Sequence, residues 1–64
     1  MVNGYMVENN NFKVVIMFTK TMEKETLDKL IRELKEEKGD DFSKEQLKNK
    51  LDTLNVNYTI SSLN

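Results

Sequence analysis

The amino-acid sequence predicts an α+β fold of the order ββααβ, with a three-stranded sheet and two helices packed on one face. Residues 12–19 form a β-branched and aromatic run with no helix breaker. Two segments with apolar residues at helical spacing follow it. Residues 56–62 then alternate apolar and polar side chains. A chain of 64 residues is short enough that we expect a single small domain over 1–64.

The first two strands are expected to form a hairpin. Tyr5–Glu8 is followed by three consecutive asparagines, Asn9–Asn11, and then by the 12–19 strand. Asparagine tolerates left-handed backbone conformations and bonds to its own backbone, so the triplet predicts the turn. Both faces of the 12–19 strand carry apolar residues, which predicts a central strand. One face holds Phe12, Val14, Ile16 and Phe18, and the other holds Lys13, Val15, Met17 and Thr19.

The first helix is predicted over about Met22–Lys38, with Thr21 as its N-cap. Glu23 and Glu25 place negative charges in the first turn, near the positive end of the helix dipole. Gly39 is expected to end the helix. The apolar stripe of this helix has the spacing i, i+3, i+4 and i+7 and consists of Leu27, Leu30, Ile31 and Leu34.

The second helix has the clearest local signal in the chain. Ser43 and Gln46 have the spacing of a capping box, and Phe42 and Leu47 have that of a hydrophobic staple. Asn55 is expected to adopt the left-handed conformation just after the helix. The buried stripe of the helix is expected to be Leu47, Leu51 and Leu54.

Residues 56–62 allow two interpretations. Val56, Tyr58 and Ile60 alternate with polar residues as in a strand, whereas Val56, Ile60 and Leu63 also fit helical spacing. We prefer the strand because this segment is poor in helix-forming residues and contains residues that favour sheets.

Composition removes most classes of catalysis. The chain has no His and no Cys, so it lacks the usual general base, thiol nucleophile and zinc ligands. Asp40 and Asp41 lack the spacing of a calcium loop. Glu33, Glu36 and Glu37 are expected on a solvated helix face, where carboxyl groups have no pocket. We therefore predict no enzyme activity, no metal and no cofactor.

Charge and hydropathy limit the kinds of partner and the cellular compartment that we expect for the protein. The formal net charge is −1, which lacks the strongly basic footprint of a nucleic-acid-binding domain. No apolar run is long enough to span a membrane, and the Met1–Gly4 start does not resemble a signal peptide. We expect a cytoplasmic protein. Its richness in Lys and Asn, with no Ala or Pro, is typical of an AT-rich coding sequence, such as that of a phage or another mobile element.

The predicted architecture leaves one sheet face without a cover. Met6, Val15 and Met17 are expected on that face, and Arg32 and Glu36 of the first helix are expected to form a charged rim. A domain of this size buries a small fraction of its surface and is marginally stable alone. The leading prediction is therefore a protein–protein interaction module of regulator or inhibitor type that forms a homodimer or binds another protein.

Two other functions are kept as alternatives. Lys44, Lys48 and Lys50 of the second helix are candidate phosphate contacts in a small nucleic-acid-binding regulator. Lys20 and Thr21, at the expected junction of strand and helix, are candidate ligands for a small anion bound by an oligomer.

Overall fold

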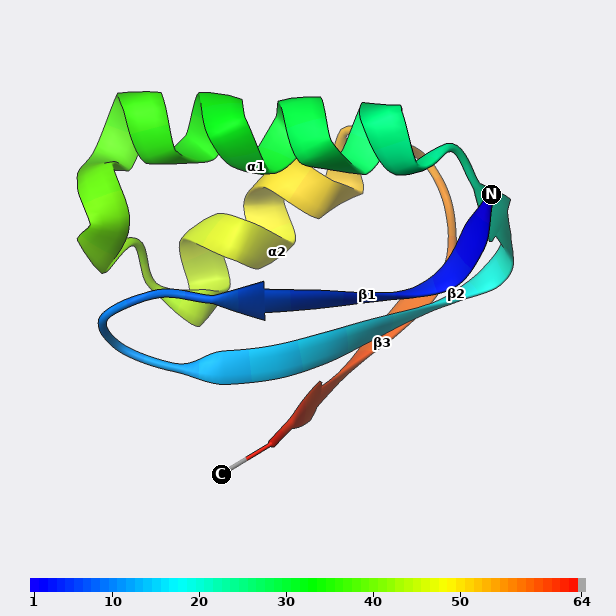
Figure 1. Cartoon of the computed structure of the whole chain (residues 1–64), viewed down its shortest axis with the longest axis horizontal. Coiled ribbons are helices and arrows are strands. Elements are labelled where there is room, and N and C mark those ends of the chain that lie inside the picture. Colours follow the sequence, from blue (N-terminus) through cyan, green and yellow to red (C-terminus); the bar gives the residue numbers. More distant parts are fainter. Residues whose placement is uncertain (64) are drawn as a thin grey trace.

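The computed structural model describes residues 1–63 and contains three strands, two α-helices and one 3-10 turn (Figure 1). The chain order is β1 (Val2–Glu8), β2 (Lys13–Met22), α1 (Lys24–Lys38), η1 (Gly39–Asp41), α2 (Lys44–Asp52) and β3 (Tyr58–Ser62).

The strands form one antiparallel sheet in the order β1-β2-β3, so β2 is central and the other two strands are edges. Both helices lie on the same side of this sheet (Figure 1). The predicted α+β arrangement ββααβ is therefore confirmed. Residues 58–62 are a strand, which decides the ambiguity of the last segment in favour of a sheet.

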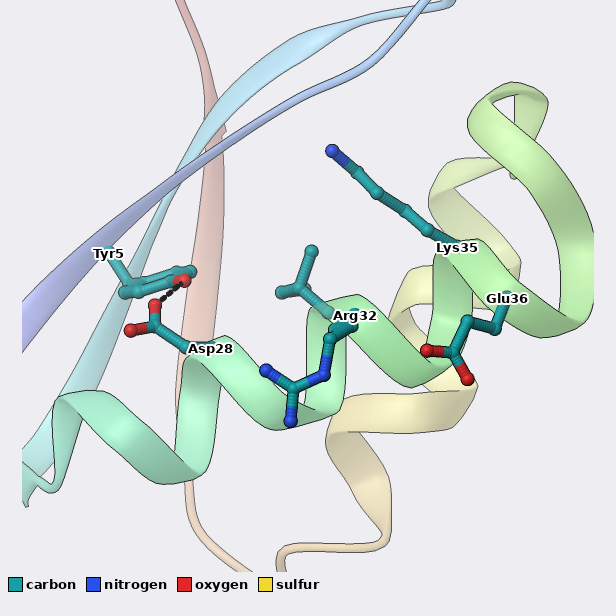
Figure 2. A pocket seen from close by; sticks show the side chains of 6 residues that line it. Tyr5, Asp28, Arg32, Lys35 and Glu36 are labelled. Atoms are coloured by element: carbon teal, nitrogen blue, oxygen red, sulfur yellow. Dashed lines mark hydrogen bonds between the residues drawn. The ribbon is translucent and has the colours of Figure 1, made fainter.

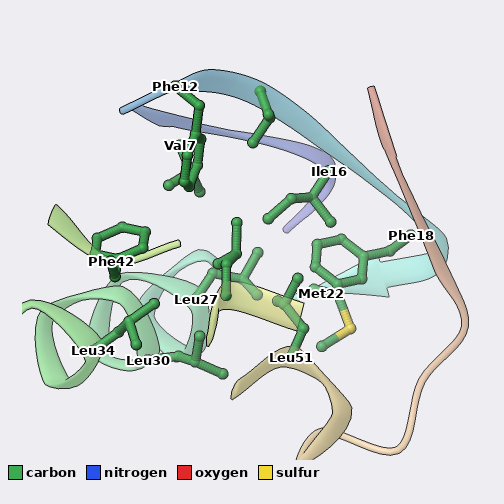
Figure 3. Packing of buried hydrophobic residues seen from close by; sticks show 12 residues of the cluster. Val7, Phe12, Ile16, Phe18, Met22, Leu27, Leu30, Leu34, Phe42 and Leu51 are labelled. Carbon is green, nitrogen blue, oxygen red and sulfur yellow. The ribbon is translucent and has the colours of Figure 1, made fainter. Parts of the chain in front are cut away.

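The core fills the space between the sheet and the two helices (Figure 3). Its sheet side comes mainly from alternate residues of β2, as the two-residue period of a strand requires. Val7 of β1 and Phe42, just before α2, also belong to the core, and Met22 continues the even-numbered series of β2 at its end. The other buried members are Phe12, Val14, Ile16, Phe18, Leu27, Leu30, Leu34, Leu47 and Leu51.

The start of the first helix differs from the prediction. β2 continues to Met22, and α1 begins at Lys24 with Glu23 at the N-cap and no side-chain capping bond. Thr21 is therefore a strand residue, and its predicted role as N-cap is wrong. The physical reason is the pairing of Met22 with Val2, which draws three more residues into the sheet and buries the Met22 side chain.

That extension requires a shift of register. Gly4 pairs with Met17, yet Val2 pairs with Met22, so four residues of β2 lie opposite one residue of β1. Extra residues in one strand of an antiparallel pair bend it and increase its twist. β2 turns up toward the start of α1 at this point (Figure 1).

The second helix is built as the sequence predicts. Ser43 Oγ accepts the Gln46 N–H at 3.0 Å, and Gln46 Oε1 accepts the Ser43 N–H at 2.9 Å, which completes the capping box. Phe42 and Leu47, the two residues of the expected staple, are both fully buried. Asn55 has a φ of 55°, in the left-handed region, as expected after the helix.

The asparagine turn does more than connect two strands. Asn9 Nδ2 donates to the Phe42 carbonyl at 2.7 Å, and Asn11 Nδ2 donates to the Asp41 carbonyl at 2.8 Å. The Asn10 backbone N–H donates to the Asp40 carbonyl at 3.1 Å. The turn thus holds the connection between the helices, and we call this set of bonds between 9–11 and 40–42 the clasp.

Candidate functional site

The sheet face opposite the helices carries an apolar cluster. Directly paired residues of antiparallel strands share a face, and Met6 pairs with Val15 while Gly4 pairs with Met17. Leu63 joins the same face at the end of β3, where its N–H donates to the Lys13 carbonyl at 2.9 Å. We call the residues Met6, Val15, Met17 and Leu63 the open face.

The open face is apolar and exposed at once. Met6 is 55% exposed, Met17 46% and Leu63 49%, and Val15 between them is half-buried. A Cβ on Gly4 would lie 3.2 Å from Met17 Sδ, so the absence of a side chain at Gly4 lets the methionine lie across β1. Three of the four exposed large apolar residues of the described chain therefore lie on the same face of the sheet.

The polar surroundings of the open face come from the sheet itself. Thr59 and Ser61 of β3 pair with Met17 and Val15, and both are exposed. At one end, Glu8 of β1 pairs with Lys13 of β2. The cluster thus has polar hydroxyl groups along one side and a pair of opposite charges at one end.

Arg32 and Glu36 do not surround the open face. Both lie on α1, on the other side of the sheet, and the rim expected from the sequence is wrong for that reason. They line a groove of about 370 Å³ between β1 and α1, together with Tyr5, Asp28, Ile31 and Lys35 (Figure 2).

A hydrogen bond closes one end of this groove. Tyr5 Oη donates to Asp28 Oδ1, and Lys24 Nζ lies 2.9 Å from Asp28 Oδ2 (Figure 2 shows the Tyr5–Asp28 bond). Burial, together with this bond, raises the pKa of Tyr5 to about 12. The bond from Tyr5 and the one from Lys24 lower the pKa of Asp28. Both shifts favour a neutral phenol beside an ionised carboxylate, which is a structural contact.

The three candidate lysines of α2 do not lie on the same side of the helix. Lys44 and Lys48 line a groove of about 430 Å³ between α2 and β3. Lys50 points to the other side of the helix, toward α1, where its Nζ lies 3.2 Å from Glu37 and 3.8 Å from Glu33. Because two carboxylates already hold Lys50, the three-lysine phosphate surface expected from the sequence is reduced to two residues.

Lys20 and Thr21 lie in β2, before the helix starts, and both are exposed. The junction that would point backbone N–H groups at an anion begins at Glu23, whose side chain is itself an anion. The geometry that motivated the anion site is therefore missing at these two residues.

The acidic residues of the helix connection serve structure. Asp40 Oδ1 lies 3.6 Å from Lys35 Nζ, and Asp41 Oδ1 accepts a hydrogen bond from Asn10 Nδ2 at 3.0 Å. Within residues 1–63 no three potential metal ligands of the His, Cys, Asp or Glu type come together. In the same part of the chain, no helix has the length and apolar character needed to cross a bilayer.

Sequence reasoning missed Leu63 as a member of the open face. The alternation that placed Tyr58 and Ile60 on the core side also assigns odd-numbered residues of this segment to the other side, and it extends to Leu63. The signal was present, but the alternative helical spacing of Leu63 obscured it.

Comparison with protein-family models, with curated proteins and with solved structures found no match for this chain. The candidate function therefore follows from the surface geometry described above.

Proposed function

We propose that the protein is a small protein–protein interaction module of regulator or inhibitor type, and that two copies associate through the open face. The observation that carries the proposal is that Met6, Val15, Met17 and Leu63 share the side of the sheet that no helix covers. Exposed apolar clusters with polar surroundings are typical of association surfaces.

The chemistry of the cluster suits a surface that adapts to a partner. Two of its four residues are methionines, whose unbranched and polarisable side chains fill irregular gaps. The cross-strand pair of Glu8 and Lys13 gives each copy one charge of each sign at the end of the face. Two copies related by a twofold axis, with the strands of one copy antiparallel to those of the other, place these pairs at opposite ends of the interface.

The exposed fractions of the open-face side chains set the expected strength of the dimer. Complete burial of a Met or Leu side chain contributes about 1.5–3 kcal/mol. Met6, Met17 and Leu63 are each roughly half exposed, so burying the remainder contributes on the order of 1 kcal/mol per side chain. Six such side chains in a dimer give about 6 kcal/mol, which is near the lower end of the cost of association. We expect a weak, concentration-dependent dimer.

Met17→Glu tests this proposal. It removes the apolar contribution twice per dimer and places a charge against an apolar partner, so we expect the dissociation constant to rise at least tenfold. Sedimentation equilibrium at high micromolar concentration measures the effect. Asn49→Glu is the matched control, because it adds the same charge at an exposed position of α2 away from the sheet.

Circular dichroism and urea unfolding must show that Met17→Glu remains folded, as expected for a side chain outside the core. A wild-type protein that is monomeric at high micromolar concentration would refute self-association. Equal dimerisation by Met17→Glu and Asn49→Glu would place any dimer interface elsewhere.

A further inference from the structure

The outer edge of β3 presents a regular set of backbone groups that β2 does not use. The bonds at both ends of this strand involve odd-numbered residues, namely Asn57 (3.1 Å) and Leu63 (2.9 Å). Hydrogen-bonded and non-hydrogen-bonded positions alternate in an antiparallel pair. The N–H and C=O groups that point away from the sheet therefore belong to the even-numbered residues Tyr58, Ile60 and Ser62.

A cationic groove lies directly beside this edge. It measures about 430 Å³ and separates β3 from α2, with Lys44 and Lys48 on the helix side. Lys44 Nζ donates to Ser62 Oγ at 2.9 Å and lies 6.0 Å from the centre of the Phe12 ring. Within residues 1–63, the ion pairs found involve neither Lys44 nor Lys48.

We propose that the β3 edge binds an extended acidic segment of another protein, which adds to the sheet as a fourth strand. Strand addition supplies backbone hydrogen bonds to Tyr58, Ile60 and Ser62, and alternate side chains of the added strand face the helix side. Carboxylates at those alternate positions reach the two lysines. Specificity for acidic segments thus comes from Lys44 and Lys48, and affinity comes from the backbone.

The other edge of the sheet fits such a segment less well. The groove beside β1 contains charges of both signs, from Asp28, Arg32, Lys35 and Glu36. It therefore offers no consistent charge to an acidic strand.

A nucleic acid also fits the β3 edge less well than a peptide strand. Its affinity would depend on several phosphate contacts, and only two lysines line the groove. Asp52 accepts the Tyr58 hydroxyl at 2.7 Å, which engages the aromatic side chain that would otherwise be available to stack on a base. Backbone groups at strand spacing match another strand and do not match a phosphate chain.

The experiment uses the full chain and a synthetic peptide of about eight residues in which Glu alternates with Thr. Binding is measured by fluorescence anisotropy of the labelled peptide, and amide hydrogen exchange is followed by NMR. We expect the amides of Tyr58, Ile60 and Ser62 to gain protection when the peptide binds. The amides of Thr59 and Ser61, which β2 already engages, should change little.

Two variants of one residue separate the backbone from the side chain. Ser62→Pro removes an outward N–H without disturbing the bonds to β2, and Ser62→Ala removes the hydroxyl but keeps that N–H. We expect Ser62→Pro to weaken peptide binding about 2- to 10-fold and Ser62→Ala to leave it within about 2-fold. Circular dichroism checks that each variant folds.

The lysines are tested independently of the backbone. Lys48→Gln should weaken the Glu–Thr peptide about 2- to 5-fold, with no effect on a peptide in which Gln replaces Glu. Lys29→Gln, at an exposed position of α1, is the matched control. Met17→Glu should bind the peptide as tightly as the wild type, because Met17 belongs to the open face and not to the β3 edge. The peptide result therefore does not depend on whether the open face mediates self-association.

Three outcomes would overturn the proposal. Peptide binding without new protection at the even-numbered amides would exclude strand addition. Binding of a single-stranded oligonucleotide, but not of the peptide, would assign the lysines to phosphate contacts. Protection at these amides that rises with protein concentration alone would assign the edge to a second copy of this chain.

Discussion

Replacing Asn9 by Ala should destabilise the fold far more than a surface substitution normally does. The Asn9 side chain makes three hydrogen bonds: Nδ2 donates to the Phe42 carbonyl at 2.7 Å, and Oδ1 accepts the N–H groups of Asn11 at 2.9 Å and Phe12 at 3.0 Å. Each bond contributes a net 0.5–1.5 kcal/mol, so their combined loss amounts to about 2–4 kcal/mol.

This magnitude is large for a small domain. Total stabilities of about 5–15 kcal/mol are usual, and 1 kcal/mol shifts the midpoint of thermal unfolding by roughly 4–8 °C in chains of 60–100 residues. Asn9→Ala should therefore lower the midpoint by about 8–32 °C. Urea unfolding followed by circular dichroism gives the free-energy change directly, with an unchanged slope if the transition stays two-state.

Asn10→Ala is the matched control, because it removes one exposed side-chain bond, from Nδ2 to Asp41 Oδ1 at 3.0 Å, and keeps the backbone bond to Asp40. Its cost should be about 1 kcal/mol or less. If the two variants lose the same stability within about 0.5 kcal/mol, the clasp does not act through Asn9, and the reasoning from bond number is refuted.

Two further predictions concern the cap of α2 and the response to alkali. Ser43→Ala should cost about 1 kcal/mol in urea unfolding, because it breaks the capping box; a change below about 0.3 kcal/mol would contradict this. Burial and hydrogen bonds to carboxylates raise the pKa of Tyr5 and of Tyr58 from 10.0 to about 12. Their contribution to stability is complete below pH 10 and disappears as the pH rises through about 12, since the unfolded chain releases these protons first. Urea midpoints between pH 10 and about 12 should fall in the wild type and fall less in the double variant Tyr5→Phe/Tyr58→Phe.

The parts of the fold that depend on local chemistry could be predicted from sequence. The capping box at Ser43 and the left-handed Asn55 are decided by neighbours a few residues away, and both are present. The alternation in β2 likewise placed Val15 and Met17 opposite the core, because a strand has a strict two-residue period.

The parts that depend on pairing between distant segments could not be predicted. Val2 pairs with Met22 across a shift of register, and this pairing, not the local helix signal, decides where α1 starts. The position of Lys50 is similar, since its two carboxylate partners lie on another helix, and helical spacing alone does not show which side of α2 faces α1. For the same reason, the charged residues Arg32 and Glu36 could be placed on a helix but not relative to the open face.

The composition of the open face also has a consequence for redox chemistry. Met6 and Met17 are exposed side chains, as is Met1, whereas Met22 is buried. An oxidant converts an accessible methionine into a polar, chiral sulfoxide, and the conversion is reversible by dedicated reductases. Oxidation would therefore place two polar oxygens at the centre of the open face while leaving the core intact. We therefore expect mild peroxide to weaken association through the open face while leaving the fold in place.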